Sequence, residues 1–188
     1  KISAGLLPLE YFELINDLWK TVSPIFTKYG AIFGKHAGDG IINYFIKKPG
    51  SDYLMDAVNC ALDLREVMKD FNRKWKLSKE WDSDLVLNIG INEGEEFFGT
   101  IQSAANIEFT ALGDSINYAG RLSDFARNGE IWTTKNLMSK LSNEEIQKLK
   151  FGVQYREKKE KTFIRNSFAR IGDVMSKDDT HYKHFSTI

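Results

Sequence analysis

Two short segments carry residue types that are suited to nucleotide chemistry. In the first, Lys35 precedes a tight Gly38–Gly40 turn that separates two apolar runs. In the second, Asn117 and Arg121 follow a Gly-Asp turn at a spacing of four residues, which places both on one face of a helix. They lie near the start of that helix, where free amide donors and the helix dipole favour anions. An amide can orient a ribose, and a guanidinium can offset charge that develops on a phosphate.

Each of these residues also has an ordinary structural explanation. Asp39, at the tip of the first turn, can hold Mg²⁺ together with phosphate oxygens, but Asp-Gly is also a favoured hairpin turn. Lys35 can be a solvated charge on an edge strand. Thr110 can hydrogen-bond the edge of a base, but a β-branched residue is common in any strand. No single one of these residues therefore indicates a function, and the evidence lies in their order along the chain.

The apolar pattern predicts the elements that position these residues. Pro8 suits a first helical turn, and apolar residues then recur at helical spacing until Tyr29-Gly30, where the helix is expected to end. A second long amphipathic helix is expected over 54–75, and the β-prone runs between the two helices predict a hairpin. Further strands are expected at 85–91, 97–101, 109–112, 131–133, 151–155 and 163–171.

Helices are expected between the later strands. One begins after residue 113, with Asp114 or Ser115 as its cap, and ends at Gly129. Another has Ser142 and Glu145 at the spacing of a capping box. The predicted fold class is α+β, with helices alternating with a mainly antiparallel sheet.

Composition limits the kinds of protein to which the chain can belong. Its 188 residues are 42% apolar and carry no formal net charge, which fits one large domain and gives no basic face for nucleic acid. The single cysteine, Cys60, excludes an internal disulfide and lies in a helical apolar pattern, so we expect a packed thiol. There is no apolar run of membrane-spanning length, no signal peptide and no initiator methionine. We therefore expect a cytoplasmic domain of a larger or membrane-anchored protein, with an upstream regulatory domain outside this chain.

In their order, the motifs closely resemble the class III adenylyl/guanylyl cyclase catalytic domain. The resemblance is carried by Lys35 with Gly38-Asp39, by Leu87-Asn88-Ile89-Gly90-Ile91-Asn92-Glu93-Gly94-Glu95 with Gly99-Thr100-Ile101, and by the run from Phe109 to Leu122. It is strong from the first helix to the strand at Trp132 and fades after Lys150. It implies a ferredoxin-like (βαββαβ) fold with a mainly antiparallel sheet and flanking helices. It also implies synthesis of a cyclic nucleotide with two divalent metal ions, at active sites formed across a head-to-tail homodimer.

The resemblance also implies roles for individual residues. Asp39 matches one of two metal-binding aspartates, and Lys35 with Thr110 matches the adenine-selecting pair of a bacterial subgroup often described as bicarbonate-responsive. Guanylyl cyclases of the family have glutamate and cysteine at those two places. Asn117 and Arg121 match the transition-state pair. In the family the metal aspartates come from one protomer and the other residues from its partner. The implied reaction is conversion of ATP to 3′,5′-cyclic AMP and pyrophosphate.

The chain departs from the family pattern in two places. The first strand, with the second metal aspartate, is expected upstream of Lys1, so two Mg²⁺ or Mn²⁺ ions are expected but only one aspartate ligand is in this chain. Glu10, Glu13 and Asp17 belong to the first helix and are poor substitutes. The family's triphosphate-binding lysine lies in a Lys-Gly-Lys-like turn, whereas the run Arg156–Lys161 has no glycine. Lys161 is the best candidate for that role.

The sequence predicts an N-terminally incomplete catalytic domain over residues 1–175 and a C-terminal tail over 176–188. The alternative function is a non-catalytic cyclase-homology domain that senses nucleotide or dimerises. A diguanylate cyclase is disfavoured, because Gly38-Asp39-Gly40-Ile41 does not match the Gly-Gly-(Asp/Glu)-Glu-Phe motif of those enzymes.

Overall fold

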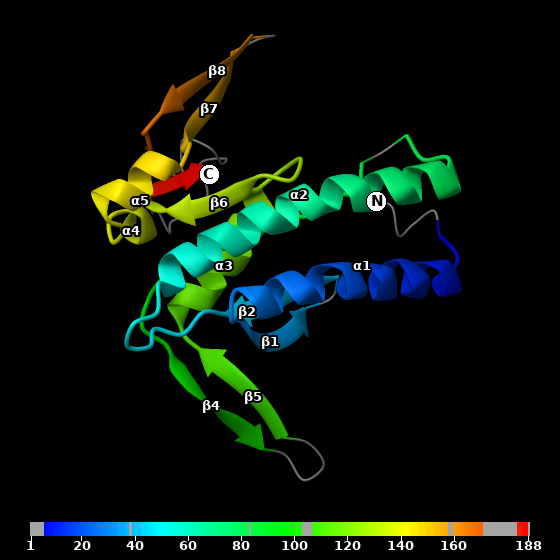
Figure 1. The fold of residues 1–188 in the computed structure, drawn as a ribbon, viewed down its shortest axis with the longest axis horizontal. Helices are drawn as coiled ribbons and strands as arrows, with labels where there is room; N and C mark the ends of the chain where they lie inside the picture. The colour runs from blue at the N-terminus through cyan, green and yellow to red at the C-terminus, as the bar shows by residue number, and fades with distance from the viewer. Residues whose placement is uncertain are drawn as a thin grey trace. The chain divides into compact units, whose positions relative to one another are not determined.

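The computed structural model describes residues 6–37, 39–82, 84–102, 107–157, 160–170 and 184–187 (Figure 1). The chain forms two compact units, Lys1–Leu87 and Asn88–Ile188. No helix within the described ranges is long and apolar enough to cross a membrane.

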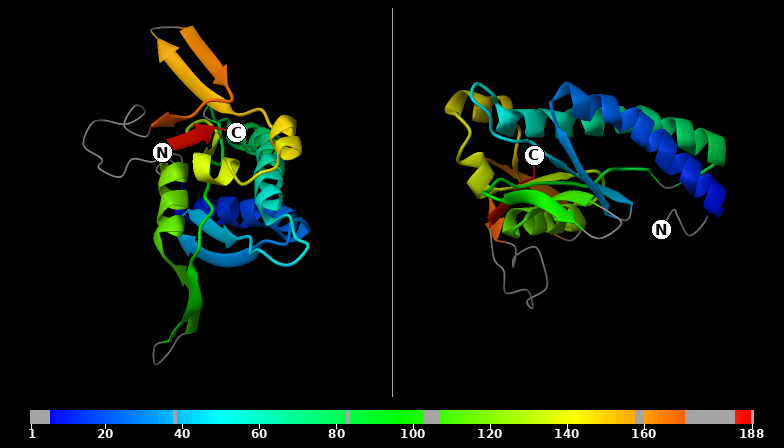
Figure 2. Two further views of the ribbon diagram at one scale, coloured as in Figure 1. Left: turned by 90° about the vertical axis from the view of Figure 1, so that its left-hand side faces the viewer. Right: turned by 90° about the horizontal axis from the view of Figure 1, so that it is seen from below.

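The first unit contains two long helices and a hairpin. Helices α1 (Pro8–Lys28) and α2 (Tyr53–Lys79) pack against each other, and strands β1 (Ile32–Ala37) and β2 (Gly40–Tyr44) pair antiparallel (Figures 1 and 2). This order confirms the two predicted helices and the hairpin between them.

The apolar faces of α1 and α2 supply the core of the first unit. The buried residues of α1 recur every four positions, which brings them onto one stripe. Cys60 is 1% exposed, and burial raises the pKa of its thiol to about 12, which confirms a packed and unreactive cysteine. The buried side chains of the two helices are Leu14, Leu18, Val22, Met55, Val58, Cys60, Ala61, Leu64, Met68, Phe71 and Trp75.

Polar contacts fix the pairing of α1 with α2. The Asp63 carboxylate accepts hydrogen bonds from Lys28 Nζ at 2.7 Å and from the Tyr29 hydroxyl at 2.8 Å. Nearer the other end, Asp17 accepts from Trp75 Nε1 at 2.9 Å and from Lys74 Nζ at 2.8 Å. These contacts join helices that are far apart in the sequence.

The second unit is built on a sheet with the strand order β3-β6-β10-β7-β8, in which β9 also pairs with β10. Among the described strands of this sheet, β3 and β6 run parallel and the other pairs are antiparallel, in agreement with the predicted mainly antiparallel sheet. Strands β4 and β5 form a separate two-stranded ribbon. The strands are β3 (Ile89–Ile91), β4 (Phe97–Gln102), β5 (Ile107–Leu112), β6 (Ile131–Thr134), β7 (Gly152–Glu157), β8 (Glu160–Arg165), β9 (Ala169–Arg170) and β10 (His184–Thr187).

Helix α3 (Asp114–Phe125) packs directly on β3, and a glycine makes this close approach possible. A Cβ atom at Gly90 would lie 2.1 Å from the Ala119 carbonyl oxygen and 2.7 Å from Leu122 Cβ. Leu122 is fully buried at this contact, with Phe125 and Trp132 packed against it. The short helices α4 (Lys135–Met138) and α5 (Asn143–Lys148) follow β6, and Ser142 and Glu145 form the predicted capping box.

Four local predictions were wrong. The strand expected at 163–171 is interrupted, because β8 ends at Arg165 and β9 begins only at Ala169. The strand expected at 85–91 is regular only over Ile89–Ile91. Helix α3 ends at Phe125 and not at Gly129, because the Ala126 backbone is already extended. Neither Asp114 nor Ser115 caps α3, whose N-cap is Gly113.

The C-terminal boundary stays a prediction. The predicted limit at residue 175 lies outside the described residues, as do residues 176–183 and Ile188 of the predicted tail. The remaining residues of that tail, His184–Thr187, form β10 and pair with β6, β7 and β9.

Candidate active site

The β1–β2 hairpin carries Lys35 and Asp39 in the places that the sequence predicts. Lys35 is half-buried on β1 opposite Ile42, and Asp39 is exposed in the turn. A register shift between Phe33 and Lys35 changes the face of the strand on which the following residues lie. No hydrogen bond or ion pair joins the Asp39 carboxylate to another described residue. Its oxygens are therefore accessible to an external cation.

Asp39 fits one part of a metal site. Mg²⁺ is usually held by one or two carboxylates together with substrate phosphates and water, and not by a complete cage of side chains. The described residues include no group of three or more histidine, cysteine, aspartate or glutamate side chains able to hold a metal ion. That Asp39 ligates a metal together with substrate stays a prediction.

Two of the three acidic residues of α1, Glu10 and Asp17, are already engaged by other side chains, whereas Glu13 forms no hydrogen bond or ion pair with another described residue. That all three are poor metal ligands stays a prediction. Glu10 forms a 2.5 Å ion pair with Lys79, and this hydrogen bond lowers the pKa of Glu10. Hydrogen bonds from Lys74 and then Trp75 lower the pKa of Asp17. Both carboxylates serve the contact between α1 and α2.

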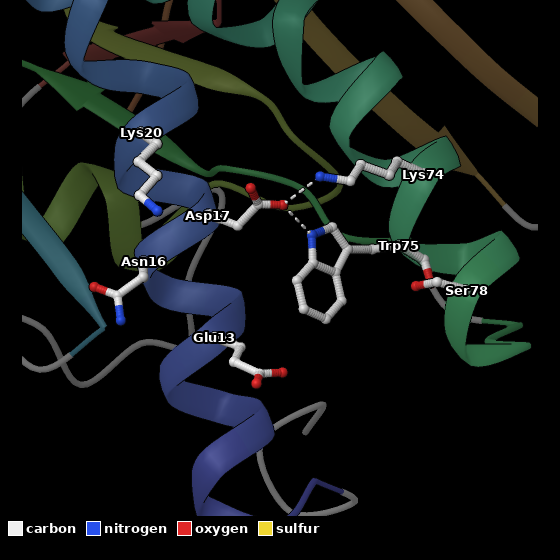
Figure 3. Close-up of a pocket in the computed structure, with 7 residues that line it drawn as sticks. All are labelled: Glu13, Asn16, Asp17, Lys20, Lys74, Trp75 and Ser78. Carbon is white, nitrogen blue, oxygen red and sulfur yellow. Dashed lines mark hydrogen bonds and ion pairs between the residues drawn. The ribbon is translucent and has the colours of Figure 1, made fainter.

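A groove of about 490 Å³ lies between α1 and α2 (Figure 3). The Asp17 carboxylate points toward Lys74 and the Trp75 indole at its wall, and the dashed lines in Figure 3 mark these two contacts. None of the residues predicted to bind substrate or metal lines it. The lining residues are Glu13, Asn16, Asp17, Lys20, Lys74, Trp75 and Ser78.

Thr110 lies on β5 opposite Gly99 of β4 and is only 2% exposed. Its hydroxyl oxygen is buried and has no hydrogen-bond partner among the described residues. A buried hydroxyl without a partner costs about 1–3 kcal/mol. The packing of the described residues does not offset that cost, and the binding role of Thr110 stays a prediction.

Asn117 and Arg121 are both exposed on α3, one helical turn apart. Neither side chain forms a hydrogen bond or ion pair within the described part of the chain. Thr110, Asn117 and Arg121 are thus brought to consecutive elements of one compact unit, whereas Lys35 and Asp39 belong to the other unit.

The start of α3 differs from the prediction. The amides of Ser115 and Ile116, expected to be free for an anion, both donate to the Glu96 carboxylate, the second at 3.2 Å. Sequence reasoning missed Glu96, because it lies well before the helix in the chain and shows no capping spacing. The one local signal was Gly113, an N-cap residue that has no side chain to accept these amides.

Lys161, predicted to bind the triphosphate, lies on β8 opposite Arg156 of β7. Its side chain lies outside the described part of the structure, as do Lys158 and Lys159 of the same run. Its role stays a prediction.

Comparison with known proteins gives consistent matches. The family model described as "Adenylate and Guanylate cyclase catalytic domain" matches residues 1–165. An adenylate cyclase of Anabaena cylindrica is 27% identical over 124 residues, which is 64% of this chain and 24% of that protein. A terminal-differentiation specific adenylate cyclase of Dictyostelium discoideum is 28% identical over 112 residues, 60% of this chain and 5% of that protein. The chain therefore spans a quarter or less of these curated relatives.

Solved structures show the same fold. The adenylyl cyclase CyaB of P. aeruginosa superposes with a TM-score of 0.74 at 21% identity, over 99% of this chain and 85% of that one. The guanylate cyclase domain of RhGC from Catenaria anguillulae, in complex with GTP, gives a TM-score of 0.69 at 20% identity, over 99% of this chain and 87% of that one. Because the family model matches most of this chain, the chain belongs to the adenylate and guanylate cyclase catalytic domain family.

Proposed function

We propose that the chain is the catalytic domain of an adenylyl cyclase, which converts ATP to 3′,5′-cyclic AMP and pyrophosphate as a homodimer. The choice of ATP rests on Lys35 and Thr110, which match the adenine-selecting pair of the family, and the Thr110 hydroxyl is buried with no partner among the described residues. Lys35 on β1 is the second member of the adenine-selecting pair. The relatives in Anabaena cylindrica and Dictyostelium discoideum, which are named adenylate cyclases, support the same choice.

The reaction assigns a distinct task to each remaining residue. The ribose 3′-oxygen attacks the α-phosphorus, the bond from that phosphorus to the bridging oxygen breaks, and pyrophosphate leaves with the electron pair. Asn117 would hold the ribose in line, and Arg121 would offset the charge that develops on the phosphate. Asp39 would hold divalent metal, Mg²⁺ or Mn²⁺, which supplies charge neutralisation and activation of the 3′-oxygen. Lys161 is the proposed contact to the triphosphate.

The β4–β5 ribbon supports the homodimer. Within the described residues it is not paired with the larger sheet, and it exposes apolar side chains along both strands. Apolar surface of this kind marks a protein contact more often than a solvated face. The exposed residues are Phe97, Phe98, Ile101, Ile107 and Leu112, with Phe97 87% exposed. We propose that a second copy of the chain covers them, with Asp39 from one protomer acting beside Asn117 and Arg121 of its partner.

The proposal is tested by product analysis. The polypeptide encoded by the whole gene, and this chain alone, would be incubated with ATP or GTP and with Mg²⁺ or Mn²⁺, and the cyclic nucleotides separated and quantified. We expect cyclic AMP from ATP at a higher kcat/KM than cyclic GMP from GTP. A higher kcat/KM for GTP would contradict the adenylyl assignment. ATP binding without product under every condition would indicate a non-catalytic cyclase-homology domain.

A further inference from the structure

In the first turn of α3, both the backbone amide and the backbone carbonyl of Ser115 are hydrogen-bonded by side chains. The Ser115 amide donates to the Glu96 carboxylate, and the Ser115 carbonyl accepts from the Asn92 side-chain amide at 3.1 Å. Glu96 accepts from the Ile116 amide as well, at 3.2 Å. Both backbone polar groups of Ser115 are thus fixed by side chains from the segment that follows β3. We call Asn92 and Glu96 the Ser115 clamp.

One side of the clamp is anchored to the sheet, and the other side has room because the N-cap is a glycine. Thr134, 2% exposed on β6, donates its hydroxyl proton to Asn92 Oδ1 at 3.0 Å, so the clamp is anchored at a buried point of the sheet. At the other side, a Cβ atom at Gly113 would lie 1.4 Å from Glu96 Oε2. The absence of a side chain at the N-cap is therefore what lets the Glu96 carboxylate reach the helix.

The first amides of any helix have no partner within it, and an N-cap side chain usually supplies one. In α3 the cap comes from Glu96, and its negative charge also complements the helix dipole. Asn117 lies two residues after Ser115, and Arg121 lies one turn further on the same twelve-residue helix. A constraint on the first turn is therefore a constraint on both side chains.

We propose that Asn92 and Glu96 are positioning residues, which hold α3 so that Asn117 and Arg121 meet the reacting ribose and phosphate in a fixed geometry. This inference rests on the proposed function for its catalytic consequence. Small misplacements of catalytic groups cost about a hundredfold in rate. Loss of the clamp should therefore lower the rate of the chemical step more than it weakens the binding of ATP.

The test compares Glu96→Ala and Glu96→Gln with a matched control. Glu145→Ala removes a carboxylate that caps α5 in the same unit, where it accepts from the Ser142 amide at 2.6 Å. Two readouts are measured on the whole gene product: hydrogen exchange of the α3 segment by mass spectrometry, and kcat and KM for ATP. The exchange readout needs no enzymatic activity, so it tests the clamp separately from the proposed function.

We expect Glu96→Ala to accelerate exchange at the start of α3 and to lower kcat by about tenfold to a hundredfold, with KM changing by less than about threefold. Glu96→Gln keeps an oxygen acceptor and should recover part of both losses. Glu145→Ala should leave kcat and α3 exchange unchanged. Unaltered exchange in Glu96→Ala would overturn the clamp. Faster exchange with unaltered kcat, or an equal loss of kcat in Glu145→Ala, would overturn its positioning role.

Discussion

The β1–β2 turn and the start of α3 handle negative charge in opposite ways. In the turn, Asp39 is exposed and its carboxylate forms no hydrogen bond or ion pair with another described residue. At the start of α3, the Glu96 carboxylate accepts hydrogen bonds from two backbone amides, and Asn92, which binds the same turn, is anchored by Thr134. The Asp39 turn contains its own carboxylate, whereas the start of α3, at Gly113, receives a carboxylate from a residue that precedes it by 17 positions in the sequence.

We interpret this difference as one between a carboxylate open to a cation, that of Asp39, and a carboxylate that holds a helix in place, that of Glu96. A carboxylate left open can ligate a cation that arrives with its substrate, whereas a carboxylate spent on a helix start stabilises a geometry. We therefore expect changes in the turn to affect metal dependence, and changes near α3 to affect the rate of the chemical step. Four predictions, in order of decreasing expected effect, test this contrast between the β1–β2 turn and the start of α3.

The largest effect is expected from Asp39→Ala. Loss of a metal ligand should lower metal-dependent turnover about a thousandfold, because metal supplies several kcal/mol of transition-state stabilisation. Asp70→Ala, which removes an exposed carboxylate paired with Arg73 on α2, is the matched control and should retain turnover. Rates are measured across a range of Mg²⁺ and Mn²⁺ concentrations. Full turnover in Asp39→Ala would refute its role as a ligand.

Arg121→Ala should have the next largest effect. Its charge matters chiefly in the transition state, so kcat should fall about a hundredfold while KM for ATP changes much less. The side chain is exposed, so the thermal midpoint of unfolding should stay close to that of the unmodified chain. Equal losses in kcat and in ATP affinity would show instead that Arg121 contacts the ground state.

Exchanging the base-selecting pair should change specificity more than rate. Lys35→Glu combined with Thr110→Cys places the residues of guanylyl cyclases at both positions, and should lower the preference for ATP over GTP by about tenfold or more. The ratio of kcat/KM for the two nucleotides is the measurement, and Thr110→Ser, which keeps the hydroxyl, is the control. An unaltered ratio in the double variant would move the base site elsewhere.

The smallest effect is expected away from both turns, at the contact between α1 and α2. Hydrogen bonds from Lys74 and Trp75 lower the folded-state pKa of Asp17 below its ordinary 3.8, so the folded chain binds this proton less readily than the unfolded chain. The resulting stability is present above pH 3.8 and is lost as the pH falls through the lowered folded value. Because the pair is partly exposed, Asp17→Asn should cost no more than about 1 kcal/mol at pH 7.

Urea unfolding at pH 7 and in acid measures this difference. The gap in the free energy of unfolding between Asp17→Asn and the unmodified chain should narrow as the pH falls below 3.8, and kcat at pH 7 should be unchanged. If the difference in the free energy of unfolding persists in acid, Asp17 stabilises the fold through packing and not through its charge.

Local pattern was sufficient to predict much of the fold. The periodic faces of α1 and α2, the hairpin turn between β1 and β2 and the capping box of α5 all depend on residues close together in the chain, and all were confirmed. Sequence could not give the parallel pairing of β3 with β6 or the place of β10, because these depend on segments far apart in the sequence.

The candidate site shows the same limit. The sequence placed Asp39 in a turn and Asn117 with Arg121 on one helical face, because each placement follows from local spacing. It could not find Glu96, whose contact with Ser115 depends on how β3 and α3 pack. It also could not show that the Thr110 hydroxyl is buried without a partner, which depends on tertiary burial.

The most direct test of the proposed homodimer is to mix two inactive variants of the whole gene product, Asp39→Ala and Arg121→Ala. If the two residues act from opposite protomers, each mixed dimer contains one complete site, so equal mixing should restore cyclic AMP synthesis to about a quarter of the unmodified rate. If they act within one protomer, no dimer contains a complete site. A mixture as inactive as its two components, with subunit exchange verified by mass spectrometry, would contradict the shared active site.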